Sequence, residues 1–75
     1  MSSQKGTPVP APMVGKLLEF KVKAGDQVAE NDVIAVIEAM KMHVDVYSPA
    51  SGTVTETYGS PGDIVKFGEA LAFIS

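Results

Sequence analysis

Lys41 is the residue of this 75-residue chain best placed for chemistry, and it lies in the segment Glu38-Ala39-Met40-Lys41-Met42. The amine of a lysine is a nucleophile that forms covalent bonds with carbonyl groups. The segment stands between two apolar runs that are typical of the arms of a β-hairpin, so we expect the amine at an exposed tip that a modifying enzyme can reach. Turns usually recruit Gly, Asn, Asp, Pro or Ser, yet here a methionine flanks the lysine on each side. Polarizable, unbranched methionines at a tip indicate a surface that other proteins grip, and their alternative role is to cap the end of the core.

The remaining polar side chains do not form a catalytic or metal-binding set. The chain has one His and no Cys. His43 and Asp45 are two residues apart on one predicted strand, but Ser/His/Asp catalysis needs a nucleophile held by a third group, and the pattern marks no serine for it. Metal binding needs three or four ligands, and no Walker-type phosphate loop occurs. We therefore expect no metal site and no enzyme that acts alone.

Composition excludes several classes of partner. The net charge is −3, with six lysines and no arginine, whereas a nucleic-acid-binding protein needs a basic face to neutralise phosphates. No apolar run approaches the roughly 20 residues of a membrane span, and no secretory pattern opens the chain. We expect no nucleic-acid partner and no direct membrane insertion. The absence of Cys fits the cytoplasm, or the mitochondrial matrix if the chain is part of a eukaryotic enzyme.

An internal repeat organises the chain. When the sequence is shifted by 37 positions, residues 11–38 fall on residues 48–75 without a gap. The identical pairs include two turn signals, namely Pro12 with Pro49 and Gly25-Asp26 with Gly62-Asp63. Solenoids need three or more units, so two copies predict one domain with pseudo-two-fold symmetry in which each half buries the apolar face of the other. The segment 39–47 joins the halves, which places the lysine hairpin at one end of the domain and both termini at the other.

Alternating and continuous apolar runs predict strands and no helix. We expect a bulge near Leu17, where the alternation breaks. Asn31 aligns with Gly68, so both are expected to fill the same left-handed turn position. With turn signals every 8 to 12 residues, an all-β sandwich or flattened barrel follows. The predicted strands are 17–22, 27–28, 33–37, 42–47, 53–58, 64–66 and 70–74.

The pentapeptide around Lys41, set between two such halves, resembles the biotinyl domain, or biotin carboxyl carrier domain, of biotin-dependent carboxylases and decarboxylases. The resemblance extends to the opening Ala11-Pro12-Met13-Val14-Gly15, to the Gly25-Asp26 turn and to Ser48-Pro49-Ala50-Ser51-Gly52. It implies a barrel-sandwich hybrid, which is a flattened barrel of two four-stranded antiparallel sheets with the modified lysine on a β-hairpin. It also implies a biotinyl domain over residues 9–75, after a flexible linker or tail over residues 1–8.

The resemblance further implies the function. Biotin would be attached covalently to Lys41 by a biotin protein ligase, with Glu38, Ala39, Met40 and Met42 as the flanking recognition residues. The domain would be a non-catalytic carrier whose swinging arm moves a carboxyl group between a biotin carboxylase and a carboxyltransferase, present as subunits or domains.

Two departures from the family and two rival functions stay open. His43 stands where the family usually has an acidic residue, and the thumb insertion of the bacterial acetyl-CoA carboxylase carrier is missing. The nearest rival is a lipoyl carrier of a 2-oxoacid dehydrogenase-type complex, whose hairpin typically reads Asp-Lys-Ala. The other is an unmodified module of the same fold that only makes protein contacts.

Overall fold

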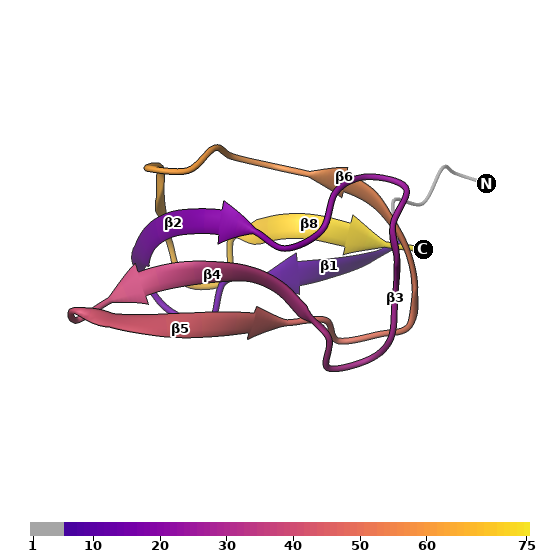
Figure 1. The fold of residues 1–75 in the computed structure, drawn as a ribbon, viewed down its shortest axis with the longest axis horizontal. Helices are drawn as coiled ribbons and strands as arrows, with labels where there is room; N and C mark the ends of the chain where they lie inside the picture. The colour runs from indigo at the N-terminus through magenta and orange to yellow at the C-terminus, as the bar shows by residue number, and fades with distance from the viewer. Residues whose placement is uncertain (1–5) are drawn as a thin grey trace.

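Eight short strands and no helix make up residues 6–75, the part of the chain that the computed structural model describes (Figure 1). No helix among these residues is therefore able to cross a membrane. The all-β prediction is confirmed. The strands are β1 (Thr7–Pro10), β2 (Gly15–Phe20), β3 (Gln27–Val28), β4 (Val33–Ala39), β5 (Met42–Tyr47), β6 (Gly52–Thr57), β7 (Ile64–Val65) and β8 (Ala70–Ile74).

The strands form two four-stranded antiparallel sheets, as predicted. One sheet has the order β1-β8-β6-β3 and the other has the order β5-β4-β2-β7. The strands β4 and β8 lie inside their sheets, and their sequences Val-Ile-Ala-Val-Ile and Ala-Leu-Ala-Phe-Ile are apolar because both of their faces are covered. The edge strands β1 and β5 alternate instead between buried and exposed residues over their final positions.

The 37-residue repeat is visible in the sheets. The shift that carries β2 onto β6 also carries β3 onto β7, β4 onto β8 and β1 onto the last four residues of β5. Each sheet is therefore the symmetry mate of the other. Neither half can bury its apolar face alone, because the sheet that covers it is built from both halves.

The core consists of symmetric pairs of aliphatic side chains. The fully buried side chains include Val9 with Val46, Leu17 with Val54, Ile34 with Leu71, and Ile37 with Ile74. Burying each such side chain contributes about 1.5–3 kcal/mol relative to leaving it in water. A domain this small buries little other surface, so the burial of these side chains is the main contribution that offsets the conformational entropy lost on folding.

The predicted turn positions and the bulge are confirmed. Asn31 has a φ of 76° and Gly68 a φ of 84°. The Asn31 N–H donates to the Ser48 carbonyl at 2.8 Å, and the Gly68 N–H donates to the Ala11 carbonyl at 2.9 Å. In β2 the pairing register with β4 shifts between Leu17 and Glu19. This bulge turns Leu17 into the core, where it is fully buried.

Several strand ends differ from the sequence-based expectation. β2 spans residues 15–20 in place of 17–22, β6 spans 52–57 in place of 53–58, and β7 ends at residue 65 in place of 66. The strand predicted over residues 33–37 continues to Ala39, which pairs with Met42. Residues 7 and 8 of the predicted tail belong to β1, where they pair with Ile74 and Phe73 of β8. Residues 1–5 of that tail lie outside the described residues.

The β4–β5 hairpin projects from one end of the domain. Figure 1 shows its tip at the left and the C-terminus, with the start of β1, at the right. This confirms the placement predicted from the repeat. The molecule is elongated, with extents of 41, 22 and 17 Å, so the tip is well separated from the C-terminus and from the start of β1.

Gly15 and Gly52 are symmetry mates at which a side chain would strike the neighbouring backbone. A methyl group on Gly15 would lie 2.6 Å from the carbonyl oxygen of Glu38, and one on Gly52 would lie 2.6 Å from the carbonyl oxygen of Ser75. Gly15→Ala and Gly52→Ala should each lower the free energy of unfolding in urea by about 1–3 kcal/mol, because the backbone must move to make room.

The two variants are matched controls for each other, because only Gly15 lies against the base of the hairpin. Gly15→Ala should shift the amide NMR resonances of residues 38–42, whereas Gly52→Ala should leave them in place. Equal shifts in both variants, or unchanged stability in both, would show that these close approaches do not constrain the strands.

Asp26 gives the fold an acid-sensitive turn. Its carboxylate accepts a hydrogen bond from the Lys23 N–H at 3.0 Å, and the Lys23 ammonium lies 3.4 Å away. That backbone hydrogen bond, aided by the Lys23 charge against an opposing effect of desolvation, holds the pKa of Asp26 below its ordinary value. Because the folded pKa is depressed, the resulting stability is present above the unfolded pKa of about 3.9 and is lost as the pH falls through the folded pKa.

Asp26→Asn should therefore flatten the acid limb of a plot of unfolding free energy against pH, below about pH 4. Asp45→Asn is the control, because the Asp45 carboxylate makes no hydrogen bond or ion pair within residues 6–75. An Asp26→Asn variant that follows the wild-type acid limb would contradict this account of the turn.

Candidate functional site

Lys41 lies at the outermost point of the hairpin, in a loop of only two residues. Ala39 at the end of β4 pairs with Met42 at the start of β5, so Met40 and Lys41 alone reverse the chain. Their φ values are 53° and 65°, both in the left-handed region. A two-residue hairpin loop with positive φ at both positions has the character of a type I′ turn, whose twist matches that of the flanking strands.

This turn is costly for its sequence. Type I′ turns favour Asn-Gly because only Gly, and to a lesser degree Asn, enters the left-handed region readily. For other residues the cost is roughly 1–2 kcal/mol each. The conformation persists because β4 and β5 pair from Val33 with Tyr47 up to Ala39 with Met42, which fixes both ends of the loop. Strain of this kind, held by well-packed surroundings, is common at functional sites.

The two methionines beside Lys41 are exposed. The side chain of Met40 is 89% exposed and that of Met42 is 67% exposed. Neither belongs to the core cluster nor packs against it. The alternative in which they cap the core is therefore wrong, and the tip presents two apolar side chains to solvent.

Glu38 and Ala39 lie at the base of the hairpin rather than at its tip. Ala39 is buried and Glu38 is half-buried. Across the sheet, Glu38 stands between Lys16 of β2 and His43 of β5. The departure at His43 therefore places an imidazole beside a carboxylate, on the exposed face that leads to the tip.

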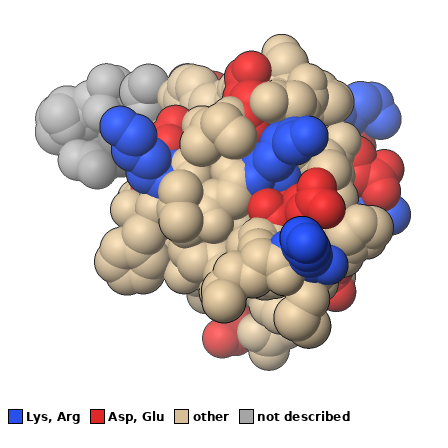
Figure 2. Space-filling model, turned by 90° about the vertical axis from the view of Figure 1, so that its left-hand side faces the viewer, with Lys and Arg blue, Asp and Glu red and all other residues tan. Residues whose placement is uncertain are grey.

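Figure 2 looks at the end of the domain that carries the hairpin. Basic and acidic groups lie side by side near the middle of this face, and uncharged atoms cover most of the rest. Lys41 is exposed and makes no ion pair within residues 6–75. Its amine is therefore open to an external acyl donor.

The site holds no visible machinery for catalysis. His43 and Asp45 are both exposed on β5, and neither lies in a hydrogen-bonded set with a serine among residues 6–75. The described residues also contain no group of three or more His, Cys, Asp or Glu side chains able to hold a metal ion. What the arrangement offers chemically is one accessible amine on a rigid turn.

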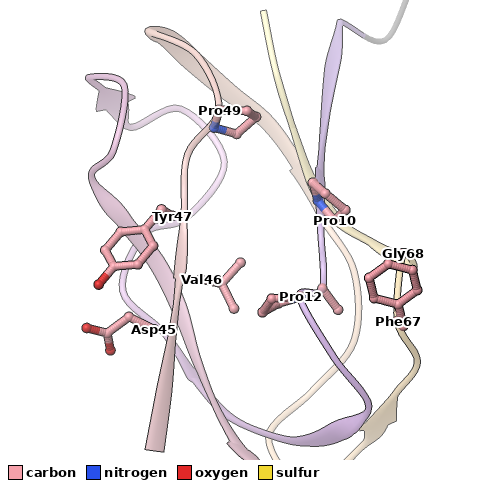
Figure 3. A pocket seen from close by; sticks show the side chains of 9 residues that line it. Pro10, Pro12, Asp45, Val46, Tyr47, Pro49, Phe67 and Gly68 are labelled. Carbon is pink, nitrogen blue, oxygen red and sulfur yellow. The ribbon is translucent and has the colours of Figure 1, made fainter.

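A hollow of about 340 Å³ lies away from the lysine, between β1, β5 and the loop that precedes β8. Prolines and aromatic residues dominate its lining, and Figure 3 shows Val46 and Pro12 pointing into the same space. Lys41 does not contribute to this hollow. The site singled out by the sequence is therefore a protrusion and not a pocket.

The left-handed conformation at the tip is the feature that sequence reasoning missed. The predicted strand ends at residue 37, which implies a loop longer than two residues. Pairing of Ala39 with Met42 leaves a two-residue loop, for which the favoured turns are types I′ and II′, both with positive φ at the first position.

Known proteins resemble this chain over nearly its whole length. The model of a family described as "Biotin-requiring enzyme" matches residues 7–74. A protein of Mycobacterium leprae named "Biotinylated protein TB7.3 homolog" is 37% identical over 67 residues, which is 89% of this chain and 94% of that protein. The biotin carboxyl carrier protein of Streptococcus mutans is 39% identical over 67 residues, and this chain spans 52% of its length.

A solved structure has the same fold. The urea carboxylase of Kluyveromyces lactis contains a region that superposes on the whole of this chain with a TM-score of 0.91 and 27% sequence identity. The matching region is 7% of the urea carboxylase chain, so it is a small part of that larger protein.

A lipoyl protein also shows similarity. The dihydrolipoyllysine-residue succinyltransferase component of the mitochondrial 2-oxoglutarate dehydrogenase complex of Saccharomyces cerevisiae is 43% identical over 58 residues. The match covers 77% of this chain and 12% of that protein. Sequence similarity thus extends to a protein named for a dihydrolipoyllysine residue, so the residues around Lys41 must distinguish a biotin site from a lipoyl site.

Replacing the turn by its favoured sequence should stabilise the domain. The double variant Met40→Asn with Lys41→Gly should raise the free energy of unfolding in urea by about 1–2 kcal/mol, because it removes the left-handed cost at both positions. The greater freedom of Gly in the unfolded chain offsets part of the gain.

The control is Met42→Asn, since Met42 lies in β5 outside the left-handed pair. That substitution should lower stability slightly, because Asn is unfavourable in strands. Loss of stability in the double variant would contradict the strained turn.

Proposed function

The chain belongs to the biotin-requiring enzyme family as a biotinyl domain, and from that premise we propose that it carries biotin as an amide on Nζ of Lys41. The observation that supports Lys41 is its position at the tip of a two-residue left-handed turn, exposed and without an ion pair among residues 6–75. No other lysine of the sequence stands between two exposed methionines.

The attachment is an acyl transfer. The deprotonated amine of Lys41 attacks the carboxyl carbon of biotin that a biotin protein ligase has activated, a C–N bond forms, and the activating group leaves. The amide carries no charge, so the formal charge of the domain falls by one from −3. The ligase must supply the activated acyl group, because the tip has no catalytic residues of its own.

The modified domain acts as a carboxyl carrier. Attached biotin supplies a ring that takes up CO2 at one enzyme site and yields it at another. The fold contributes the rest: β4 and β5 hold the attachment point away from the body of the domain, and tethering raises the local concentration of the arm at each site to the order of millimolar. The proposed partners are a biotin carboxylase and a carboxyltransferase, and the domain itself is non-catalytic.

The residues around Lys41 divide into two groups in this proposal. Met40 and Met42 are exposed and would contact the ligase and the partner enzymes. Ala39 is buried and Glu38 is half-buried, so they would fix the base of the turn and contribute less contact area. His43 adds a side chain beside Glu38 that the partners must accommodate.

The lipoyl carrier is the second candidate, because the yeast succinyltransferase component is among the similar proteins. The flanks of Lys41 argue against it. Met40 and Met42 stand where the lipoyl hairpin typically has Asp and Ala. A lipoyl ligase that contacts the residues beside the lysine would therefore bind two thioethers in place of a carboxylate and a methyl group.

Co-expression with a biotin protein ligase tests the proposal. Intact mass and peptide mapping should find one biotin on Lys41 in the wild type and in Lys66→Arg, whose lysine is also exposed, and none in Lys41→Arg. Lys41→Arg keeps the charge and removes the acylatable amine, and its free energy of unfolding should stay within about 0.5 kcal/mol of the wild type.

Two results would overturn the assignment. Biotin on another lysine in Lys41→Arg would mean that the tip is not the attachment site. An unmodified wild type, folded and in the presence of an active ligase, would move the assignment to the lipoyl carrier, which a lipoyl ligase would then test on the same two variants.

A further inference from the structure

Two of the most exposed apolar side chains of the domain are thioethers, and both lie directly beside Lys41. Met40 is 89% exposed and Met42 is 67% exposed. Met13, the other methionine within the described residues, is only 37% exposed. Among residues 6–75, the methionine side chains most accessible to a soluble oxidant are therefore those at the tip of the hairpin.

We propose that Met40 and Met42 form an oxidation-sensitive site, at which conversion to the sulfoxides by a peroxide stops the ligase from accepting the hairpin. The proposal rests on the proposed function, because it assumes that Lys41 is biotinylated. It goes further in assigning the two methionines a regulatory chemistry and not only a contact role.

The chemistry needs no catalytic group of the protein. A lone pair of the thioether sulfur attacks one oxygen of hydrogen peroxide, the O–O bond breaks, an S–O bond forms, and water leaves after proton transfer. The sulfur loses two electrons and the peroxide gains them. A methionine sulfoxide reductase reverses the step with electrons from a thiol.

The structure separates the effect on recognition from any effect on folding. Oxidation of a buried methionine disrupts a core, but neither Met40 nor Met42 contributes to the core cluster. The oxidised domain should therefore stay folded. The tip changes from two flexible apolar side chains to two polar, strongly hydrated ones, which a surface shaped for thioethers must desolvate in order to bind.

Because the turn is short, a ligase that binds around Lys41 also meets the oxidised side chains of Met40 and Met42. With a loop of two residues fixed by the pairing of Ala39 with Met42, the positions next to Lys41 cannot rearrange independently of it. A ligase that reaches Lys41 therefore meets a tip in which the residues on both sides carry exposed thioethers. With both made polar, the rate of biotinylation at low domain concentration should fall about tenfold, the change produced by about 1.4 kcal/mol of binding free energy.

The first experiment maps oxidation on the unmodified full chain. Graded hydrogen peroxide, followed by proteolysis and mass spectrometry, should add oxygen to Met40 and Met42 several-fold faster than to Met13. Oxidation of Met13 at the same rate would contradict the proposed selectivity. Thermal unfolding of the oxidised sample should match that of the untreated sample, which excludes loss of the fold as the cause of later effects.

The second experiment measures initial biotinylation rates with a purified ligase, before and after the domain is treated with peroxide and the peroxide removed. The ratio of the two rates is the readout, so a variant with a lower starting rate remains informative. The ratio should be about one tenth in the wild type and in Met13→Leu. It should be near one in the double variant Met40→Leu with Met42→Leu, and reductase treatment should restore the oxidised wild type.

The outcomes separate the two proposals. If the untreated domain is not biotinylated at all, the proposed function fails. If the untreated domain is biotinylated and the ratio is near one in the wild type, only the oxidation-sensitive site is refuted. A ratio as low in the double variant as in the wild type would also refute it, because the sensitivity would then lie elsewhere.

Discussion

The register of β4 against β5 leaves two residues to reverse the chain, and the site depends on that constraint. Ala39 pairs with Met42, and Met40 and Lys41 both take positive φ in the two-residue turn that results. A longer loop would remove the strain, but it would also let the lysine move relative to its neighbours. Pairing of the two strands thus fixes the backbone positions from which the Lys41 amine and the two methionine side chains project.

That pairing depends in turn on contacts made far from it in the sequence. β4 is held on its other side by β2, whose Gly15 allows the backbone to approach Glu38 at the base of the hairpin. The outer strands are kept in place by a core to which both halves of the repeat contribute matching side chains. The hairpin lies at one end of the domain, and the start of β1 and the C-terminus lie at the other.

The equivalence of the strands, the main turns and the lysine segment could be predicted from the sequence, because each depends on residues close to it along the chain. The repeat fixed which strands are equivalent, and turn residues such as Asn31 and Gly68 marked the reversals, because few residues tolerate their backbone conformation. The pentapeptide around Lys41 marked it as the candidate site by its residue types. The end of β4 and the handedness of the turn did not follow from the sequence. Ala39 belongs to β4 because it pairs with Met42 of β5, and an alanine by itself does not indicate such pairing. The exposure of Met40 and Met42 likewise depends on where the strand ends.

Pairing of β4 with β5 holds Met40 and Lys41 in the left-handed region. Backbone NMR on the unmodified domain tests this by measuring the φ-dependent couplings and the order parameters of these two residues. We expect couplings that match positive φ at both residues and order parameters near the value of about 0.85 found in rigid backbone. Averaged couplings with order parameters below about 0.6 would contradict it, since the tip would then be a flexible loop and its methionines would have no fixed relation to the lysine.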